Sequence, residues 1–269
     1  MKAIHASLLL ALLALLAPSP SHAQQSPGSG TTDEPASRWS IGIAGVLRDS
    51  EYAGEGNRSI VFPTVAYEGE RFYLRGPVAG YRLVKRDRFG LNAFVAARLD
   101  GIDADDFGVE ELARRGIDRD LLEDRDHSAD AGLSAMWKGG AGEVELDVRA
   151  DITNTSDGYQ AAVNYRYPIR VGRVTLTPGL GATVLSDDMA NYYYGTLEEE
   201  VARGVVDYKP GRSTIPHIGL SAVVPFASRW LFIANAQLRS LPDEIQDSPL
   251  LEHDVENVTM LFISVSRRF

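Results

Sequence analysis

The chain has 269 residues, contains no cysteine and carries a formal net charge of -10. The absence of thiols excludes a disulfide framework, a lipoprotein-type acylation site, zinc–thiolate binding and a cysteine nucleophile. The acidic balance argues against a nucleic-acid partner, because that binding depends on clustered Lys and Arg that neutralise phosphates.

The N-terminal segment has the order of a secretory signal peptide. Lys2 precedes an apolar run over residues 8–17. Two small residues, Ser21 and Ala23, then follow with the spacing that a signal peptidase recognises. The run is shorter than the roughly 20 residues of a membrane helix, and no stop-transfer pattern follows, so an uncleaved anchor is the weaker alternative. We predict a signal peptide over residues 1–23 and a flexible polar leader over residues 24–38.

The remaining chain, residues 39–269, contains no internal linker and is predicted to form one all-β domain. Residues 143–151 alternate between charged and apolar side chains, which is the pattern of a strand with two unlike faces. Residues 128–137 and 159–167 repeat it, with aromatic side chains near the ends. Their lengths approach the 9–11 residues that a tilted membrane strand needs, and end aromatics would lie at the lipid headgroups.

The connections between these strands alternate in length. Counting back from the C-terminus, the longer ones all fall on one side of the sheet, at residues 240–254, 187–212, 153–157 and 101–127, and the turns at residues 227–229, 168–172, 138–142 and 85–88 fall on the other. Short periplasmic turns and long external loops are typical of outer-membrane barrels. The fold class that follows is an antiparallel transmembrane β-barrel.

The N-terminal part of this barrel is less regular. Residues 39–47, 59–67 and 71–84 read as strands, and a turn at Gly76-Pro77 would divide the third into two short strands, giving about 12 in total. An even number is the rule for bacterial barrels. Pro63 is an awkward residue for a strand, because proline cannot donate to a central ladder.

The last segment, residues 258–269, places Leu261, Ile263 and Val265 on the same face as the terminal Phe269. A strand that ends on a C-terminal Phe resembles the signal by which the barrel-assembly machinery recognises outer-membrane proteins. Arg267 departs from the pattern, because it falls on that apolar face.

Several short pieces resemble the MipA/OmpV family of outer-membrane proteins in their order along the chain. The pieces are Gly45-Val46, Tyr52–Gly54, Tyr67–Gly69, Phe72, Arg75-Gly76, Ala131–Ser134, Thr177–Gly181, Asn191–Gly195, Ala202-Arg203, Tyr208–Pro210 and Leu241–Leu250. The resemblance implies an outer-membrane location and a scaffold that bridges a lytic murein transglycosylase and a penicillin-binding protein. Other members are described as porin-like, and the family brings no catalytic residue.

Two acidic clusters could indicate metal binding or hydrolysis, but each has a simpler structural explanation. Asp100, Asp103, Asp105 and Asp106 could ligate Ca²⁺, but they lack the EF-hand spacing, so a solvated external loop is favoured. A second group could be imagined as a hydrolytic cluster, yet a structured loop explains it better, because surface acids are common. Its members are Asp243, Glu244, Asp247, His253 and Asp254.

No catalytic, cofactor or metal residue is therefore predicted, and no nucleophile elbow stands between a strand and a helix. Tyr192, Tyr193 and Tyr194 could stack on a sugar or antibiotic, but anchoring a loop at the membrane interface is favoured. Inward charges, among them Glu143, Glu145, Asp147, Arg149 and Arg166, either line a channel or pair across a filled lumen.

Two functions remain for a non-enzymatic barrel in the outer membrane. The resemblance favours a murein-synthesis scaffold with those two enzymes as partners. The alternative is a porin-like channel for small solutes or antibiotics, which the shortness of the periplasmic turns mildly favours.

Overall fold

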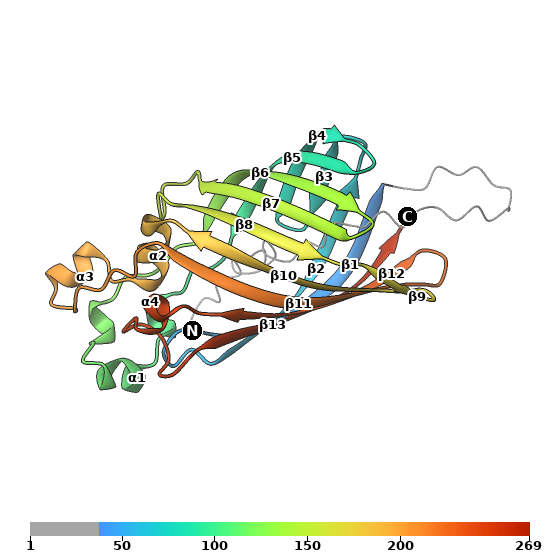
Figure 1. The fold of residues 1–269 in the computed structure, drawn as a ribbon. Coiled ribbons are helices and arrows are strands. Elements are labelled where there is room, and N and C mark those ends of the chain that lie inside the picture. The colour runs from blue at the N-terminus through green and yellow to red at the C-terminus, as the bar shows by residue number, and fades with distance from the viewer. Residues whose placement is uncertain (1–37) are drawn as a thin grey trace, which may run out of the picture.

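The structure, a computed structural model, describes residues 38–269 and forms one closed antiparallel sheet (Figure 1). Strands that follow one another in the chain pair with each other, except β8 and β9, and β1 pairs with β13 to close the sheet. The strands are β1 Trp39–Asp49, β2 Asn57–Glu68, β3 Phe72–Arg75, β4 Val78–Lys85, β5 Phe89–Arg98, β6 Ser128–Gly139, β7 Gly142–Asp151, β8 Tyr159–Arg166, β9 Ile169–Val171, β10 Val174–Leu185, β11 Ser213–Phe226, β12 Trp230–Ser240 and β13 Asn257–Arg268.

The thirteen strand segments build a barrel of twelve wall strands. β8 and β9 follow one another and both pair with β10, so they are one strand interrupted at Pro168. The predicted barrel of about twelve strands is confirmed. The turn predicted at residues 168–172 is wrong in its bounds, because the chain continues as a strand to Val171 and turns at Gly172, whose φ of 60° suits glycine.

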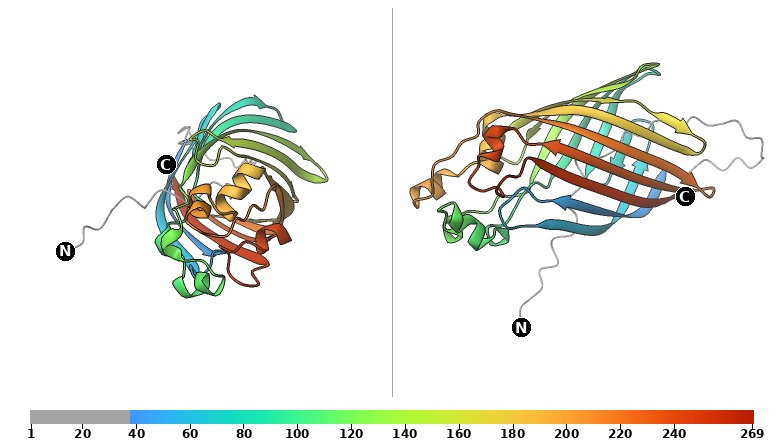
Figure 2. Two further views of the ribbon diagram at one scale, coloured as in Figure 1. Left: turned by 90° about the vertical axis from the view of Figure 1, so that its left-hand side faces the viewer. Right: turned by 60° about the horizontal axis from the view of Figure 1, so that its bottom comes forward.

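The two ends of the barrel differ in their connections. Short turns gather at the end where the C-terminus lies, called here the turn end, and long connections gather at the opposite loop end (Figures 1 and 2). The loop end carries the helical segments of residues 38–269: η1 Ala104–Asp106, α1 Val109–Arg114, η2 Arg119–Leu121, α2 Asp187–Tyr194, α3 Glu198–Ala202 and α4 Asp243–Gln246. Among residues 38–269, no helix is long and apolar enough to cross a membrane.

The predicted turn at Gly76-Pro77 is present and ends a short hairpin. Arg75 pairs with Val78 across the turn, and Gly76 has a φ of 55°. β3 has four residues whereas β2 has twelve, so the hairpin stops part-way along the neighbouring strand. Among the described residues, the other connections on the loop-end side join at the barrel mouth, and this turn alone stops short of it.

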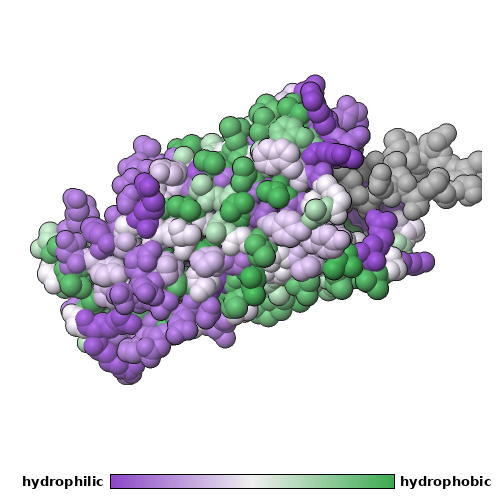
Figure 3. Space-filling view, in the orientation of Figure 1, coloured by the Kyte–Doolittle hydropathy of each residue, from purple (hydrophilic) through white to green (hydrophobic). Residues whose placement is uncertain are grey.

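The outer wall is apolar, as the alternation predicts. Ile43, Leu180 and Ile218 are more than half exposed although they lie in the middle of strands, and hydrophobic residues gather over the strands in Figure 3, whereas the loop end is hydrophilic. Alternate positions such as Asp130 and Ser134 face inward and are buried. An exposed apolar band between polar ends is what a membrane-spanning barrel presents to lipid.

Aromatic side chains form a girdle at the turn end. Four ring pairs lie there with centroids 4.8 to 6.1 Å apart: Trp39–Tyr67, Phe72–Tyr81, Phe89–Trp137 and Phe226–Trp230. Arg267 belongs to the same rim, with its guanidinium 5.6 Å from the Phe269 ring centroid. This position explains why a charged residue is found on the apolar face of the last strand, because a long cationic side chain at the rim can reach polar surroundings.

Candidate functional site: a lumen closed at the loop end

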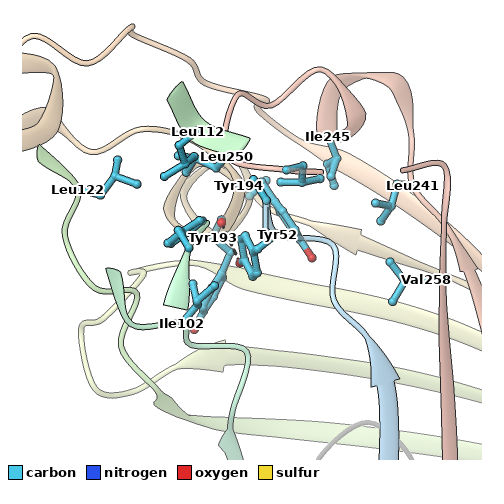
Figure 4. Close-up of a cluster of buried hydrophobic side chains, with 14 of the residues drawn as sticks. Tyr52, Ile102, Leu112, Leu122, Tyr193, Tyr194, Leu241, Ile245, Leu250 and Val258 are labelled. Atoms are coloured by element: carbon cyan, nitrogen blue, oxygen red, sulfur yellow. Dashed lines mark hydrogen bonds between the residues drawn. The ribbon is translucent and has the colours of Figure 1, made fainter. Parts of the chain in front are cut away.

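The long connections at the loop end fold together into a lid with its own hydrophobic core (Figure 4). Helix α2 lies across the mouth in the end-on view of Figure 2. The core draws residues from four loops and from the adjoining strand ends: Tyr52, Ala53, Ile102, Phe107, Leu112, Ile117, Leu122, Leu185, Met189, Ala190, Tyr193, Tyr194, Val205, Ile215, Leu241, Ile245, Leu250, Leu251 and Val258.

Hydrogen bonds between loops tie the lid into one unit. The Tyr52 hydroxyl donates to the Tyr193 carbonyl at 3.0 Å, and the Ala53 amide donates to the Leu250 carbonyl at 3.0 Å. The Ser248 hydroxyl donates to the Tyr194 carbonyl at 2.6 Å. Loops that are distant in the chain, by 54 to 197 positions in these three contacts, are therefore held together at the mouth.

A buried ion pair fixes the lid from within. The Arg125 guanidinium donates to both Glu200 carboxylate oxygens, at 2.7 and 2.9 Å, and neither side chain is exposed. Arg125 also donates to the Tyr192 and Gly195 carbonyls, and Glu200 accepts from the Leu197 amide. A buried pair whose remaining donors and acceptors are satisfied in this way specifies one arrangement of the loops around it.

A layer of charges lies directly beneath the lid. Arg98 donates to Asp130 at 2.6 Å and to Gln160 at 2.7 Å, and it pairs with Asp100 at 3.1 Å. On the other side, Arg48 pairs with Glu51 at 2.6 Å.

Two loop carboxylates of this layer have shifted pKa values. Burial alone would raise the pKa of Glu51 and Asp100, but Arg48 next to Glu51, and Arg98 and Arg48 next to Asp100, lower both below their ordinary values. Glu51 and Asp100 are therefore ionised and paired at neutral pH.

Below this layer the barrel encloses a cavity of about 610 Å³. Met189, Tyr193 and Tyr194 of the lid form its ceiling, and Lys85 and Arg268 line it close to the turn end. The inward charges on β7 and β8 line its wall, as predicted, and they are paired: Lys138 with Glu143, Arg149 with Asp147, and Arg166 with Glu145. The lumenal wall at β7 and β8 is thus charged, and the lumen extends from the lid towards the turn end.

One lumenal cluster lies on the β3–β4 hairpin. The guanidinium carbons of Arg75 and Arg82 lie 4.6 and 5.0 Å from the Tyr73 ring centroid, and both side chains also pair with Glu68. Gly80 leaves the space for that ring, because a Cβ at this position would lie 2.2 Å from the Tyr73 ring atoms.

Charge is distributed unequally between the two ends. The loop over residues 99–127 contains eleven acidic and four basic residues. At the turn end, the exposed charged residues of the described chain are mostly basic, with Glu70 and Asp87 as the exposed acids. The basic rim, as we name it, comprises Arg38, Arg71, Lys85, Arg86, Arg88, Arg170, Arg173, Arg229, Arg267 and Arg268.

Three of the four aspartates considered as Ca²⁺ ligands pair with arginines. Asp100 pairs with Arg98, Asp105 lies 3.9 Å from Arg119, and Asp106 lies 3.3 Å from Arg58. In the part of the chain that the structure describes, no three His, Asp or Glu side chains come close enough to hold a metal.

The residues considered as a hydrolytic cluster lie in one loop. Asp243 and Glu244 begin α4, whose Ile245 is buried in the lid core. The His253 imidazole lies 2.6 Å from the Asp254 carboxylate, and both side chains are largely exposed. That loop serves to pack the lid, which is the structural role favoured from the sequence.

The predicted role of the tyrosine run as a membrane-interface anchor is wrong. Tyr193 and Tyr194 are 3% and 6% exposed, inside the lid and above the cavity, and the Tyr192 hydroxyl accepts from the Asp126 amide of another lid loop. Helix α2 turns these rings inward, since Met189 and Ala190 on the same helix are also in the lid core. Burial raises the pKa of the Tyr193 and Tyr194 hydroxyls.

Two features of this site were missed from the sequence. Arg125 and Glu200 carry no local signal, because their pairing depends on how two distant loops meet. The basic rim does carry one: arginines such as Arg71, Arg86 and Arg229 lie in or beside the short turns, except the turn between β6 and β7, and they can be found once the turns are assigned.

Comparison with known proteins agrees with the architecture. A family model described as MltA-interacting protein MipA matches residues 41–269. The outer membrane protein YiaT of Escherichia coli strain K12 is 29% identical over 239 residues, which are 87% of this chain and 92% of that protein. The MltA-interacting protein of the same organism is 30% identical over 193 residues, which are 71% of this chain and 74% of that protein.

Similar solved structures are outer-membrane barrels. The NanC porin covers 85% of this chain with all of its own, at 7% identity and a TM-score of 0.45. An outer membrane channel from Pseudomonas putida covers 90% of this chain with all of its own, at 10% identity and a TM-score of 0.42. The family match over residues 41–269 is the finding that identifies the protein: the chain belongs to the MltA-interacting protein MipA family of outer-membrane β-barrel proteins.

Proposed function

We propose that this protein is an outer-membrane docking protein whose periplasmic end binds a lytic murein transglycosylase, with a bifunctional penicillin-binding protein as a second partner. The observation that carries the proposal is the closed loop end. A lid with a continuous hydrophobic core and a buried Arg125–Glu200 pair opposes free passage of solutes through the lumen. The turn end, which faces the periplasm in outer-membrane barrels, is left for interaction.

The basic rim supports a periplasmic partner of opposite charge. Arg86 and Arg88 lie in the three-residue turn between β4 and β5 and are both exposed, and the remaining basic residues continue around the same end. A ring of one charge steers an acidic surface towards it and sets its orientation. The name of the Escherichia coli relative, MltA-interacting protein, supplies the class of enzyme to test.

A gated channel is the second candidate, and the cavity favours it. A lumen of about 610 Å³ with charged residues on its β7 and β8 wall runs from the lid towards the turn end, so displacement of the lid would complete a path across the barrel. In this alternative the lid is a gate, and the lumenal charges set selectivity. No catalytic role enters either proposal.

A binding experiment tests the docking proposal. The refolded protein in lipid vesicles is mixed with a purified MltA-type transglycosylase, and the dissociation constant is measured by flotation at low and moderate salt. We expect salt-sensitive binding that the double variant Arg86→Glu, Arg88→Glu weakens at least about tenfold, since charge pairs across an interface contribute on this scale.

The matched control reverses two exposed arginines of the lid, Arg114→Glu and Arg212→Glu, which lie at the opposite end. This control should bind as the unaltered protein does. Docking at the basic rim is refuted if the folded protein does not bind the enzyme, or if both double variants bind equally well.

A further inference from the structure

The wall of the barrel is incomplete beside β2. On one side β2 pairs with β1 along its whole length, from Asn57 to Tyr67. On the other side it pairs with β3 at Ala66, Tyr67 and Glu68, because the β3–β4 hairpin turns back at Gly76-Pro77. Among the described residues, no strand pairs with residues 57–65 on that side. We call this opening between β2 and β5 the notch.

Backbone directions show which peptide groups face the notch. The Val65 carbonyl accepts from the Gly76 amide of the hairpin, whereas the Glu68 amide donates towards Arg38 on the β1 side. Because successive peptide groups of a strand alternate in direction, Ser59, Val61 and Pro63 direct their backbone groups as Val65 does. Pro63 therefore lies on the unpaired side, where its missing N–H removes no ladder bond, and this explains its place in the strand.

Apolar side chains line both lumenal borders of the notch. On the β2 side, the inward residues Ala44, Val46, Phe62, Met260 and Phe262 form a buried cluster, with Ile60 packed against it. On the hairpin side lies a second, smaller cluster. It consists of Tyr73, Val78 and Ala96, with Phe94 packed against it.

The lumenal wall at β7 and β8 is different in character. These strands present paired charges such as Arg149–Asp147 and Arg166–Glu145 to the cavity. The borders of the notch thus contrast with β7 and β8, whereas β11 and β12 also give the cavity apolar residues, among them Val223 and Ile233. Outside it, Val61 is 70% exposed and continues the apolar outer wall.

The notch is a window with a closed upper border. At the loop end of β2, Arg58 donates to the Gly101 carbonyl at 3.4 Å and pairs with Asp106 at 3.3 Å, and it also pairs with Glu55. These contacts join β2 to the loop that leaves β5. The opening is therefore bounded by β2, the hairpin tip, the end of β5 and this loop.

We propose that the notch is a lateral portal that joins the lumen to the lipid phase and accepts the acyl chain of a membrane amphiphile. The apolar borders suit a hydrocarbon chain, and the outer side faces lipid. Pro63 argues against a β-strand from a second protein, because it removes a donor from the middle of the edge. The free peptide groups of Ser59 and Val61 suit an occupant with a polar end, since unpaired backbone is tolerated in a membrane where it meets water or another partner.

Site-directed quenching tests the portal, and the absence of cysteine allows single labels. Phe62→Cys and Ile60→Cys each place a bimane label on the lumenal side of the notch. Val61→Cys is the lipid-facing reference, and Ala162→Cys labels the lumen on the opposite wall. Each variant is refolded into vesicles of ordinary phosphatidylcholine or of phosphatidylcholine with dibrominated acyl chains, and heat-modifiable migration confirms that it has folded.

The portal predicts that brominated chains quench the label at position 62 or 60 nearly as strongly as at position 61, and leave the label at position 162 bright. Two lumenal positions are used so that failure of one variant to fold does not prevent the test. Equal fluorescence at the three lumenal positions, whether all bright or all quenched, would overturn the proposal.

Discussion

Arg125 and Glu200 are 75 positions apart in the chain and form a two-pronged ion pair in which neither side chain is exposed to solvent. The pair joins the loop after β5 to the loop after β10, across the mouth of the barrel. Its contribution is to the order of the lid and not to the strands, because neither residue lies in a strand of the wall.

Removal of one partner should open the lid while the barrel stays folded. Arg125→Met leaves the Glu200 carboxylate buried without its partner, and breaking a buried pair in this way costs about 3–5 kcal/mol. We expect rapid trypsin cleavage at Arg114 and Arg115 in the variant, with unchanged heat-modifiable migration. Arg203→Ala, which breaks the exposed pair with Glu123, is the control and should leave cleavage slow. Equal protection of both variants would contradict a lid held by the buried pair.

Acid should loosen the lid. The pKa values of Glu51 and Asp100 are lower in the folded protein than in the unfolded chain, mainly because Arg48 and Arg98 outweigh the effect of burial. Carboxylates with lowered pKa values stabilise the fold above their unfolded values and lose that contribution as the pH falls through the folded values. Glu55, whose pKa burial raises, acts in the opposite direction.

We therefore expect the lid to be intact at neutral pH and to loosen as the pH falls below about 4. Near-ultraviolet circular dichroism of the lid tyrosines should decrease there, while the far-ultraviolet strand signal persists. Asp100→Asn should reduce the pH dependence. A lid signal lost between pH 7 and 5 would be inconsistent with these lowered pKa values.

Proline scanning of β2 distinguishes its two sides. Val61→Pro places the missing N–H at the notch and should change the free energy of unfolding little more than Val61→Ala does. Ile60→Pro removes a donor directed at β1, opposite Val46, and should cost about 1–3 kcal/mol beyond Ile60→Ala. Urea unfolding from vesicles measures all four variants. Similar costs for both prolines would mean that the edge facing the notch is paired.

Gly80→Ala should destabilise the β3–β4 hairpin. The added methyl would overlap the Tyr73 ring, so the ring must leave its place between Arg75 and Arg82, at about 1–3 kcal/mol for an overpacked site. The same substitution in a Tyr73→Leu background should cost much less, since the overlap is relieved. Additive losses in the double variant would show that the clash is not with Tyr73.

Export should remove the first 23 residues, a segment that lies outside the described part of the chain. Intact mass of the protein isolated from outer membranes should correspond to a chain that begins at Gln24, and Ala23→Arg should leave the longer form because a bulky cation does not fit the peptidase pocket. A mature chain that retains Lys2 would refute the signal peptide.

The wall of the barrel could be predicted because its signal is local. Each strand alternates between apolar and polar residues within its own length, and Glu143–Asp151 shows this period by itself. The hairpin turn is likewise recognised from two adjacent residues, Gly76 and Pro77. The unpaired edge of β2 could not be predicted, because pairing on that side depends on where the β3–β4 hairpin ends. The sequence indicated it only through Pro63, a residue that does not suit a strand paired on both sides.

The lid could not be predicted, because its contacts are not local. Tyr193 and Tyr194 look alike whether they face lipid or a core, and their burial follows from loops more than fifty residues away. For the same reason the sequence does not decide between an open channel and a filled barrel. It does predict that the charged residues on β7 and β8 face the lumen, and they do.

Single-channel conductance in a planar bilayer tests the central claim most directly, which is that the lid closes the lumen. The refolded protein at neutral pH should insert and remain silent, whereas the Arg125→Met variant should show stable conductance steps, because its lid no longer covers the cavity. Stable steps of the same size in both proteins would contradict a closed lid and would make the channel the primary function.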